Sequence, residues 1–236
     1  MARAFVGAAF MAVIAAMPAS AAEPVYKFSY TYPAEARAIP QLRTWLEADK
    51  ARMRGKFAAQ AAAAKRDAEK SGYPYRQYDA EREWKLVTNT PRFLSLSRTN
   101  WEYTGGAHGN TGYDALLWDK AARVRLQPAA VFSNPKALYA SVRKAFCDKL
   151  DVARAQRRGG PVKRSNDMFN DCIDPVEQVL ILGSSGGGRI NRIGFIIAPY
   201  NAGSFAEGTY DVTLPVTPAI LAQVKPAYRS AFAVAR

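Results

Sequence analysis

The residues with the clearest chemical potential lie in one short glycine-rich stretch. It reads Tyr103-Thr104-Gly105-Gly106-Ala107-His108-Gly109-Asn110 and contains the only histidine of the chain. A single histidine excludes every mechanism that needs two. The glycines predict a sharp turn through positive φ values that a Cβ would block, and we expect the turn to need Gly105 and Gly106.

Two roles are open for His108. It donates a hydrogen bond to a backbone carbonyl and so fixes the glycine turn, or it recognises a ligand. For the second role the candidate binding residues are Tyr103, His108, Asn110 and Tyr200. A wider set of aromatic residues forms either a ligand platform or ordinary strand packing, and we expect packing. These residues are Trp101, Tyr103, Tyr113, Trp118 and Tyr200.

Three further motifs fail to complete a catalytic set. Gly183-Ser184-Ser185-Gly186-Gly187 matches the G-x-S-x-G nucleophile elbow, but a strand-like run at residues 189–195 follows where a helix is needed. The same segment falls short of a phosphate-binding loop, because Arg189-Ile190 stand where Lys-Ser/Thr is required. Two S-x-x-K matches, at residues 133–136 and 141–144, lack the other β-lactamase motifs. We therefore predict no catalytic residue.

A metal site is also not expected. It would need His108 to pair with carboxylates such as Asp114 or Asp119, and one histidine among scattered carboxylates is a weak ligand set. The two cysteines are too distant in sequence to complete a zinc cluster. We predict neither a metal nor a cofactor.

The first residues predict export. Arg3 precedes an apolar run over residues 4–17, which is shorter than the about 20 residues that span a bilayer. Pro18 ends the run, and Ala19-Ser20-Ala21 supplies the small residues of a cleavage site. We predict that residues 1–21 are a signal peptide and that the mature chain is periplasmic or secreted, without a transmembrane anchor. An uncleaved anchor or a buried N-terminal helix is the alternative.

The charge of the chain points to anionic partners. Lys and Arg number 33 against 20 Asp and Glu, a formal net charge of +13. In an exported protein such a balance favours an anionic envelope polymer, or an envelope protein, as the partner. Nucleic acid is not expected, because no nucleic-acid-binding motif is present.

The two cysteines predict a disulfide. Cys147 falls within a helical pattern over residues 135–157, off its apolar stripe, so we expect it on the flank or outer face of that helix. A long loop carrying Cys172 follows and can reach that face. Oxidising compartments favour the bond. Two buried free thiols are the alternative.

Patterning predicts α+β architecture, with a mostly antiparallel sheet in two small lobes, one long N-terminal helix and a second helix packed on the sheet. The long helix spans residues 40–71, with Pro40 in its first turn and Gly72 just past its end. We place the lobes at residues 22–111 and 112–236. The predicted strands are residues 25–32, 84–88, 93–103, 113–119, 178–182, 189–198 and 209–214.

The glycine stretch, together with Val131-Phe132 after it, resembles a family of exported bacterial domains. So does the run from Phe195 to Gly208, which contains Pro199-Tyr200-Asn201 and leads to Leu214-Pro215. This is the PdaC/RsiV-like family, found in lysozyme-sensing anti-sigma factors and in the accessory region of peptidoglycan deacetylases. The resemblance implies an α+β fold of two small lobes and an envelope-related role, and it implies no catalytic residue. Asn201 stands where the family commonly has an acidic residue.

The predicted function is that of an exported, non-enzymatic domain that binds or senses the cell envelope, with peptidoglycan or another anionic component as its ligand. One alternative is an enzyme acting on cell-wall glycan, with His108 and a nearby carboxylate as acid and base. Another is a protein inhibitor of a lytic enzyme.

Overall fold

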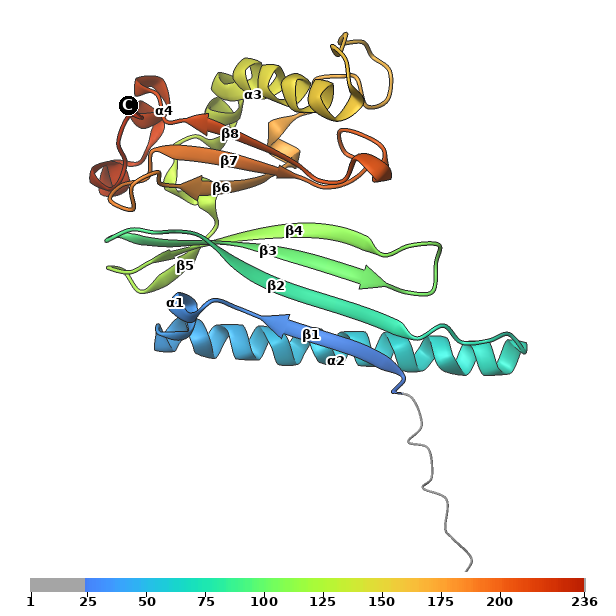
Figure 1. Ribbon diagram of the computed structural model, residues 1–236. Helices are drawn as coiled ribbons and strands as arrows, with labels where there is room; N and C mark the ends of the chain where they lie inside the picture. Colours follow the sequence, from blue (N-terminus) through green and yellow to red (C-terminus); the bar gives the residue numbers. More distant parts are fainter. Residues whose placement is uncertain (1–23, 236) are drawn as a thin grey trace, which may run out of the picture.

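The structure, a computed structural model, describes residues 24–235. The predicted signal peptide, residues 1–21, lies outside the described residues. Within them, no helix is long and apolar enough to cross a membrane. The predicted α+β fold is confirmed. Two sheets pack together, and a long helix covers the outer face of each, which gives four layers (Figure 1).

The first sheet has five strands in the order β1-β2-β3-β4-β5. Their bounds are β1 Tyr26–Thr31, β2 Tyr78–Asn89, β3 Phe93–Tyr103, β4 Asn110–Asp119 and β5 Val124–Leu126. The β1–β2 pair is parallel and the other pairs are antiparallel. The parallel pair follows from the long crossover between these two strands, which contains the short helix α1 (Ala34–Arg37) and the long helix α2 (Pro40–Ser71).

Helix α2 covers one face of this sheet over its whole length (Figure 1). Pro40 stands in its first turn, and Gly72 ends it in the left-handed conformation, with φ 73°, as the sequence predicts. The apolar face of α2 packs on the sheet, since Leu42, Leu46 and Phe57 are buried. The buried face of α2 therefore has the helical spacing that the apolar residues indicate.

The same face of α2 also buries a charged residue that the pattern of apolar residues does not reveal. Asp49 has only 3% of its surface exposed. Its carboxylate accepts hydrogen bonds from Tyr30 Oη at 2.9 Å and from Arg98 Nη1 at 2.8 Å. Tyr30 in turn accepts one from Trp84 Nε1 at 2.9 Å. Burial raises the pKa of Tyr30 well above its usual value, and the neighbouring Asp49 carboxylate adds to this, so the hydroxyl remains a donor.

The second sheet is antiparallel, with the order β6-β7-β8. Its strands are β6 Val179–Gly183, β7 Arg192–Ile197 and β8 Tyr210–Pro215. Strand β6 lies against β2, β3 and β4 of the first sheet. Helix α3 (Pro135–Arg158) covers the outer face, where the Phe146 and Phe195 rings meet edge to face at 5.1 Å. Phe93 and Leu117 of the first sheet join the hydrophobic cluster of the second, so the two layers share one core.

A disulfide joins α3 to the loop that follows it, as the sequence predicts. Cys147 and Cys172 are bonded, with a Cα–Cα distance of 5.4 Å. Of the two expected positions of Cys147, the outer face is wrong, because Cys147 is 1% exposed and belongs to the core cluster. The physical reason is the loop itself: held by the bond, its partly buried Cys172 packs against that flank of α3.

The first sheet extends beyond the lobe boundary expected at residue 111. Strand β4 pairs with β3 along its whole length, and β5 continues the sheet to Leu126. Strand β2 is longer than the predicted residues 84–88, because the alternation of buried Ala80, Arg82 and Trp84 with exposed neighbours starts earlier. The division of the chain into residues 22–111 and 112–236 stays a prediction.

Candidate functional site

The glycine-rich stretch forms the turn of the β3–β4 hairpin, residues 104–109, at one end of the first sheet (Figure 1). Gly105 has φ 90°, a conformation that favours glycine. The positive φ expected at Gly106 is not found. Gly109 is instead the second demanding position, because a Cβ there would lie 2.3 Å from Nε1 of Trp101, whose indole covers the turn.

We expect Gly109→Ala to lower the free energy of unfolding by about 2 kcal/mol, because the added methyl group forces the Trp101 indole out of its place. Gly106→Ala is the matched control. A Cβ at Gly106 meets only ordinary contacts and φ is not positive, so we expect a change within about 0.5 kcal/mol. Urea denaturation of both variants measures the difference. Equal stabilities would contradict the assignment of the close approach to Gly109.

His108 brings the hairpin turn into contact with the loop between β7 and β8 of the second sheet. Its ring stacks on Phe205, with centroids 3.9 Å apart and planes inclined by 21°. Its Nε2 lies 3.3 Å from the hydroxyl of Tyr200, and its Nδ1 lies 2.9 Å from the carbonyl oxygen of Gly109. These distances fit the tautomer in which Nδ1–H donates to the backbone and the tyrosine hydroxyl donates to Nε2. We call His108, Tyr200 and Phe205 the aromatic shelf.

Tyr200 is the most unusual member of the shelf. Its φ is 71°, in the left-handed region that few residues with a Cβ occupy. Its side chain is nevertheless 51% exposed, so core packing does not account for the position. Strained backbone that presents an exposed aromatic ring is typical of binding sites, where the surrounding structure imposes the conformation.

The β7–β8 loop, residues 198–209, carries Tyr200 and Phe205, and arginines of α3 hold it in place. Arg154 is completely buried and donates from Nε to the carbonyl oxygen of Ala202 at 2.9 Å. Arg157 donates from Nη2 to the carbonyl oxygen of Thr209 at 2.5 Å. The shelf therefore stands on a fixed loop rather than on a free one.

Glu207 fastens the loop from within. Its carboxylate accepts hydrogen bonds from the Ser204 backbone N–H at 3.0 Å, from Arg158 Nε at 2.8 Å and from the Tyr210 hydroxyl. A Cβ at Gly203 would lie 2.5 Å from the carboxylate, which explains the glycine there. Burial alone would raise the pKa of Glu207, but these hydrogen bonds outweigh it and lower the pKa to about 2.

The lowered pKa of Glu207 predicts a pH dependence of stability. In the unfolded chain the group titrates near 4.5, so its contribution is fully present above that pH and is lost as the pH falls through about 2. We expect Glu207→Gln to lower the melting temperature clearly at pH 6 and much less at pH 2.5. Thermal melts of both proteins across this range measure the difference. A difference in melting temperature that does not change with pH would contradict the prediction.

The predicted binding residues divide into two groups. The structure brings His108 and Tyr200 together. Tyr103 is half-buried at the end of β3 and Asn110 is exposed at the start of β4, and neither makes a hydrogen bond to His108 or Tyr200 in residues 24–235. A role for Tyr103 and Asn110 in binding stays a prediction. The sequence does not indicate Phe205, although it lies in the same run as Tyr200, residues 195–208, because a phenylalanine in a loop gives no periodic signal.

The other aromatic residues of the proposed platform mostly pack, as expected. Trp118 is buried against α2, and Trp101 lies over Gly109. The hydroxyl of Tyr113 shares a hydrogen bond of 2.6 Å with the Thr209 side chain. That bond joins β4 of the first sheet to the end of the β7–β8 loop of the second sheet, beside the shelf.

The site offers recognition chemistry rather than a complete acid–base pair. In the described residues, both ring nitrogens of His108 face Gly109 and Tyr200, and no carboxylate makes a hydrogen bond to the ring. Over residues 24–235, no three His, Cys, Asp or Glu side chains form a group that could hold a metal ion. What the shelf presents is an exposed ring face with polar atoms at its edge.

This fold and site define an α+β protein of two packed sheets with an aromatic surface where they meet. Residues 20–111 match the family model described as deacetylase PdaC, so this part of the chain is similar to that family. The matched stretch contains β1, α2, β2, β3 and the hairpin turn with His108. The predicted resemblance to the PdaC/RsiV-like family is thus confirmed.

Solved structures that match the chain include a member of the DUF3298 family from Bacteroides fragilis, at 18% identity and a TM-score of 0.43. The match covers 75% of this chain and 66% of that one, so the chain spans just under two thirds of its length. A DUF3298 family protein from Pseudomonas aeruginosa matches at 15% identity and a TM-score of 0.43, over 74% of this chain and 72% of that one. No curated protein matches the chain significantly.

Proposed function

We propose that this protein is an exported, non-enzymatic domain that binds the cell envelope through the aromatic shelf. The observation that carries the proposal is the exposed Tyr200 ring, held on strained backbone against His108 and Phe205. A fixed aromatic face with polar atoms at its edge suits a sugar ring, whose faces are apolar and whose rim is polar.

Two further features support an envelope location. The Cys147–Cys172 disulfide fits an oxidising compartment. The formal charge of +13 favours an anionic polymer such as peptidoglycan. Asn201, where the family commonly has an acidic residue, donates from its side chain to Gln178 Oε1 at 3.2 Å, so here the position contributes to the packing of the loop.

The alternative of a glycan-modifying enzyme has less support. Glu207, the carboxylate of the β7–β8 loop, is held ionised by its partners, with a pKa of about 2. A general acid or base works best with a pKa near the working pH. His108 would have to act alone.

Sedimentation with purified sacculi tests the proposal. We expect wild-type protein to pellet with sacculi, and Tyr200→Ala to weaken binding up to about tenfold, because stacking on an aromatic ring is worth about 0.5–1.5 kcal/mol. Val152→Ala is the matched control, since Val152 is an exposed residue of α3 that is not part of the shelf. Fragments released into the supernatant, and lost in His108→Ala, would favour the enzyme. Sedimentation that does not depend on Tyr200 would contradict the proposed site.

A further inference from the structure

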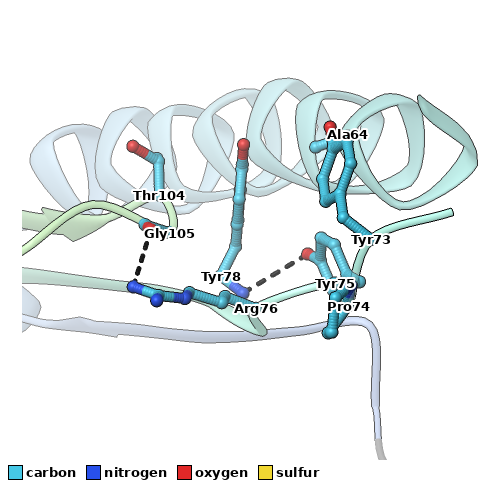
Figure 2. A pocket seen from close by; sticks show the side chains of 8 residues that line it. All are labelled: Ala64, Tyr73, Pro74, Tyr75, Arg76, Tyr78, Thr104 and Gly105. Atoms are coloured by element: carbon cyan, nitrogen blue, oxygen red, sulfur yellow. Dashed lines mark hydrogen bonds between the residues drawn. The ribbon is translucent and has the colours of Figure 1, made fainter. Parts of the chain in front are cut away.

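A second candidate site lies on the opposite face of the same hairpin turn. It is a pocket of about 210 Å³ between the C-terminal end of α2, the segment 73–78 and the turn of the β3–β4 hairpin (Figure 2). The aromatic shelf contacts this turn from the side of the second sheet, whereas the pocket opens on the side of α2. Its walls contain Tyr73, Tyr75, Arg76, Tyr78 and Thr104.

The pocket is preformed by its own backbone. Gly72 ends α2 in the left-handed conformation and turns the chain back along the helix. Tyr75 then donates its hydroxyl hydrogen to the carbonyl oxygen of Val25 at 2.8 Å and accepts one from the backbone N–H of Tyr78 at 3.3 Å. Tyr75 is thus a fixed support, and a ligand would not have to order these residues.

The remaining walls combine ring faces with polar groups. Tyr73 is 55% exposed although its ring lines the pocket, and the ring of Tyr78 stands between it and Thr104 (Figure 2). Arg76 donates from Nη1 to the carbonyl oxygens of Gly105 and Gly106, at 3.3 Å each. These bonds hold the guanidinium at the rim and leave its Nε and Nη2 donors for a ligand.

We infer that this pocket binds a single sugar ring that carries a carboxylate. Its volume is below the roughly 300–1,000 Å³ of pockets for drug-sized ligands, which suits one ring rather than an oligosaccharide. The tyrosines offer faces for the apolar side of the ring, and Thr104 offers a hydroxyl. Arg76 can donate two parallel hydrogen bonds to a carboxylate, a pairing for which guanidinium geometry is suited.

The inference does not depend on the aromatic shelf, and a matched pair of ligands tests it. D-glucuronate and D-glucose differ only in the carboxylate at C6. We expect NMR titration of the folded protein to shift the signals of residues 73–78 and 104–105, with glucuronate binding about tenfold more tightly than glucose. Arg76→Gln should remove that preference, and Tyr73→Ala should weaken both ligands. Tyr200→Ala is the control and should change neither.

Shifts spread over the surface, or a preference for glucuronate that Arg76→Gln leaves intact, would overturn the inference. Arg76→Lys is the control for a folding defect, because it keeps the charge and should retain part of the preference for glucuronate. Acidic sugars occur in peptidoglycan and in soluble polyuronates, so pelleting with sacculi and retention on immobilised polygalacturonate separate the sources. If Tyr200→Ala loses sacculus binding and Arg76→Gln keeps it, the result supports the proposed function and indicates that the pocket binds the polyuronate. NMR shifts with glucuronate, but no binding to sacculi, would support the inferred pocket and contradict the proposed function.

Discussion

Replacing Arg154 by methionine should lower the free energy of unfolding by about 3–5 kcal/mol, because it removes a completely buried charge whose partners stay behind. The guanidinium donates to the carbonyl oxygens of Ala202 at 2.9 Å and Asp171 at 2.8 Å, and to the Asp151 carboxylate at 3.2 Å. Methionine keeps an unbranched apolar stem but donates no hydrogen bond. Two carbonyl groups would lose a charged partner in a region that excludes water.

The loss should also reach the candidate site. Ala202 lies in the β7–β8 loop, two residues after Tyr200. Loss of its hydrogen bond to Arg154 therefore loosens the loop that carries the shelf. We therefore expect Arg154→Met to weaken sacculus binding even at temperatures where the protein is folded. Lys149→Met is the matched control, because Lys149 is exposed on the same helix and its replacement should change stability by less than about 0.5 kcal/mol. Urea denaturation compares them, and a similar midpoint for the two variants would refute the role of Arg154.

The extent to which the fold follows from the sequence can be read from α2 and α3. Both begin at a proline in the first turn and end at a glycine with positive φ, Gly72 and Gly159, and both bury the stripe that their apolar residues indicate. Apolar periodicity and end signals are local properties, and the sequence displays them directly. The parallel pairing of β1 with β2 was not predicted, because it depends on where the chain returns after α2.

The same stripes also show what periodicity misses. Asp49 follows Leu46 by three residues, and Arg154 follows Leu150 by four, so each lies on the buried face of its helix. Charged residues are usually assigned to the solvent, since burying one costs free energy unless partners compensate it. Asp151 and Arg52 lie three residues from Arg154 and Asp49 on the same helices. The other partners are distant in sequence, namely Arg98 for Asp49 and the carbonyl oxygens of Asp171 and Ala202 for Arg154. A charged residue that falls in phase with an apolar stripe is the signal that could have found them.

The candidate site was predictable only in part for a related reason. The glycines around His108 and the run around Tyr200 mark two turns, and each is visible alone. Their meeting depends on the packing of β6 against the first sheet. This packing brings the Tyr200 hydroxyl within 3.3 Å of His108 Nε2, although the two residues are 92 positions apart in the sequence. The stacking of His108 on Phe205 is a consequence of that packing. Neither the spacing nor the composition of either loop specifies it.

Replacing Asp49 by alanine should be the second large loss, about 3 kcal/mol of unfolding free energy. The carboxylate compensates the partly buried Arg98, whose guanidinium also lies 4.8 Å from the Trp84 ring centre. Alanine leaves Arg98 with Asp114 alone, and Asp114 is half-exposed. It also removes the acceptor for the Tyr30 hydroxyl. Asp67→Ala, on the exposed face of α2, should change stability by less than about 0.5 kcal/mol.

A double-mutant cycle separates this network from the simple loss of a side chain on α2. Tyr30→Phe alone should cost about 1 kcal/mol, the usual net value of a buried hydrogen bond. In the Asp49→Ala background the hydroxyl has already lost its acceptor but still accepts from Trp84 Nε1, so the same change should cost less than it does in the wild type. Urea denaturation of the four proteins gives the coupling free energy. Strict additivity would mean that Tyr30 and Asp49 stabilise the fold independently, and that the hydrogen bond between them contributes nothing of its own.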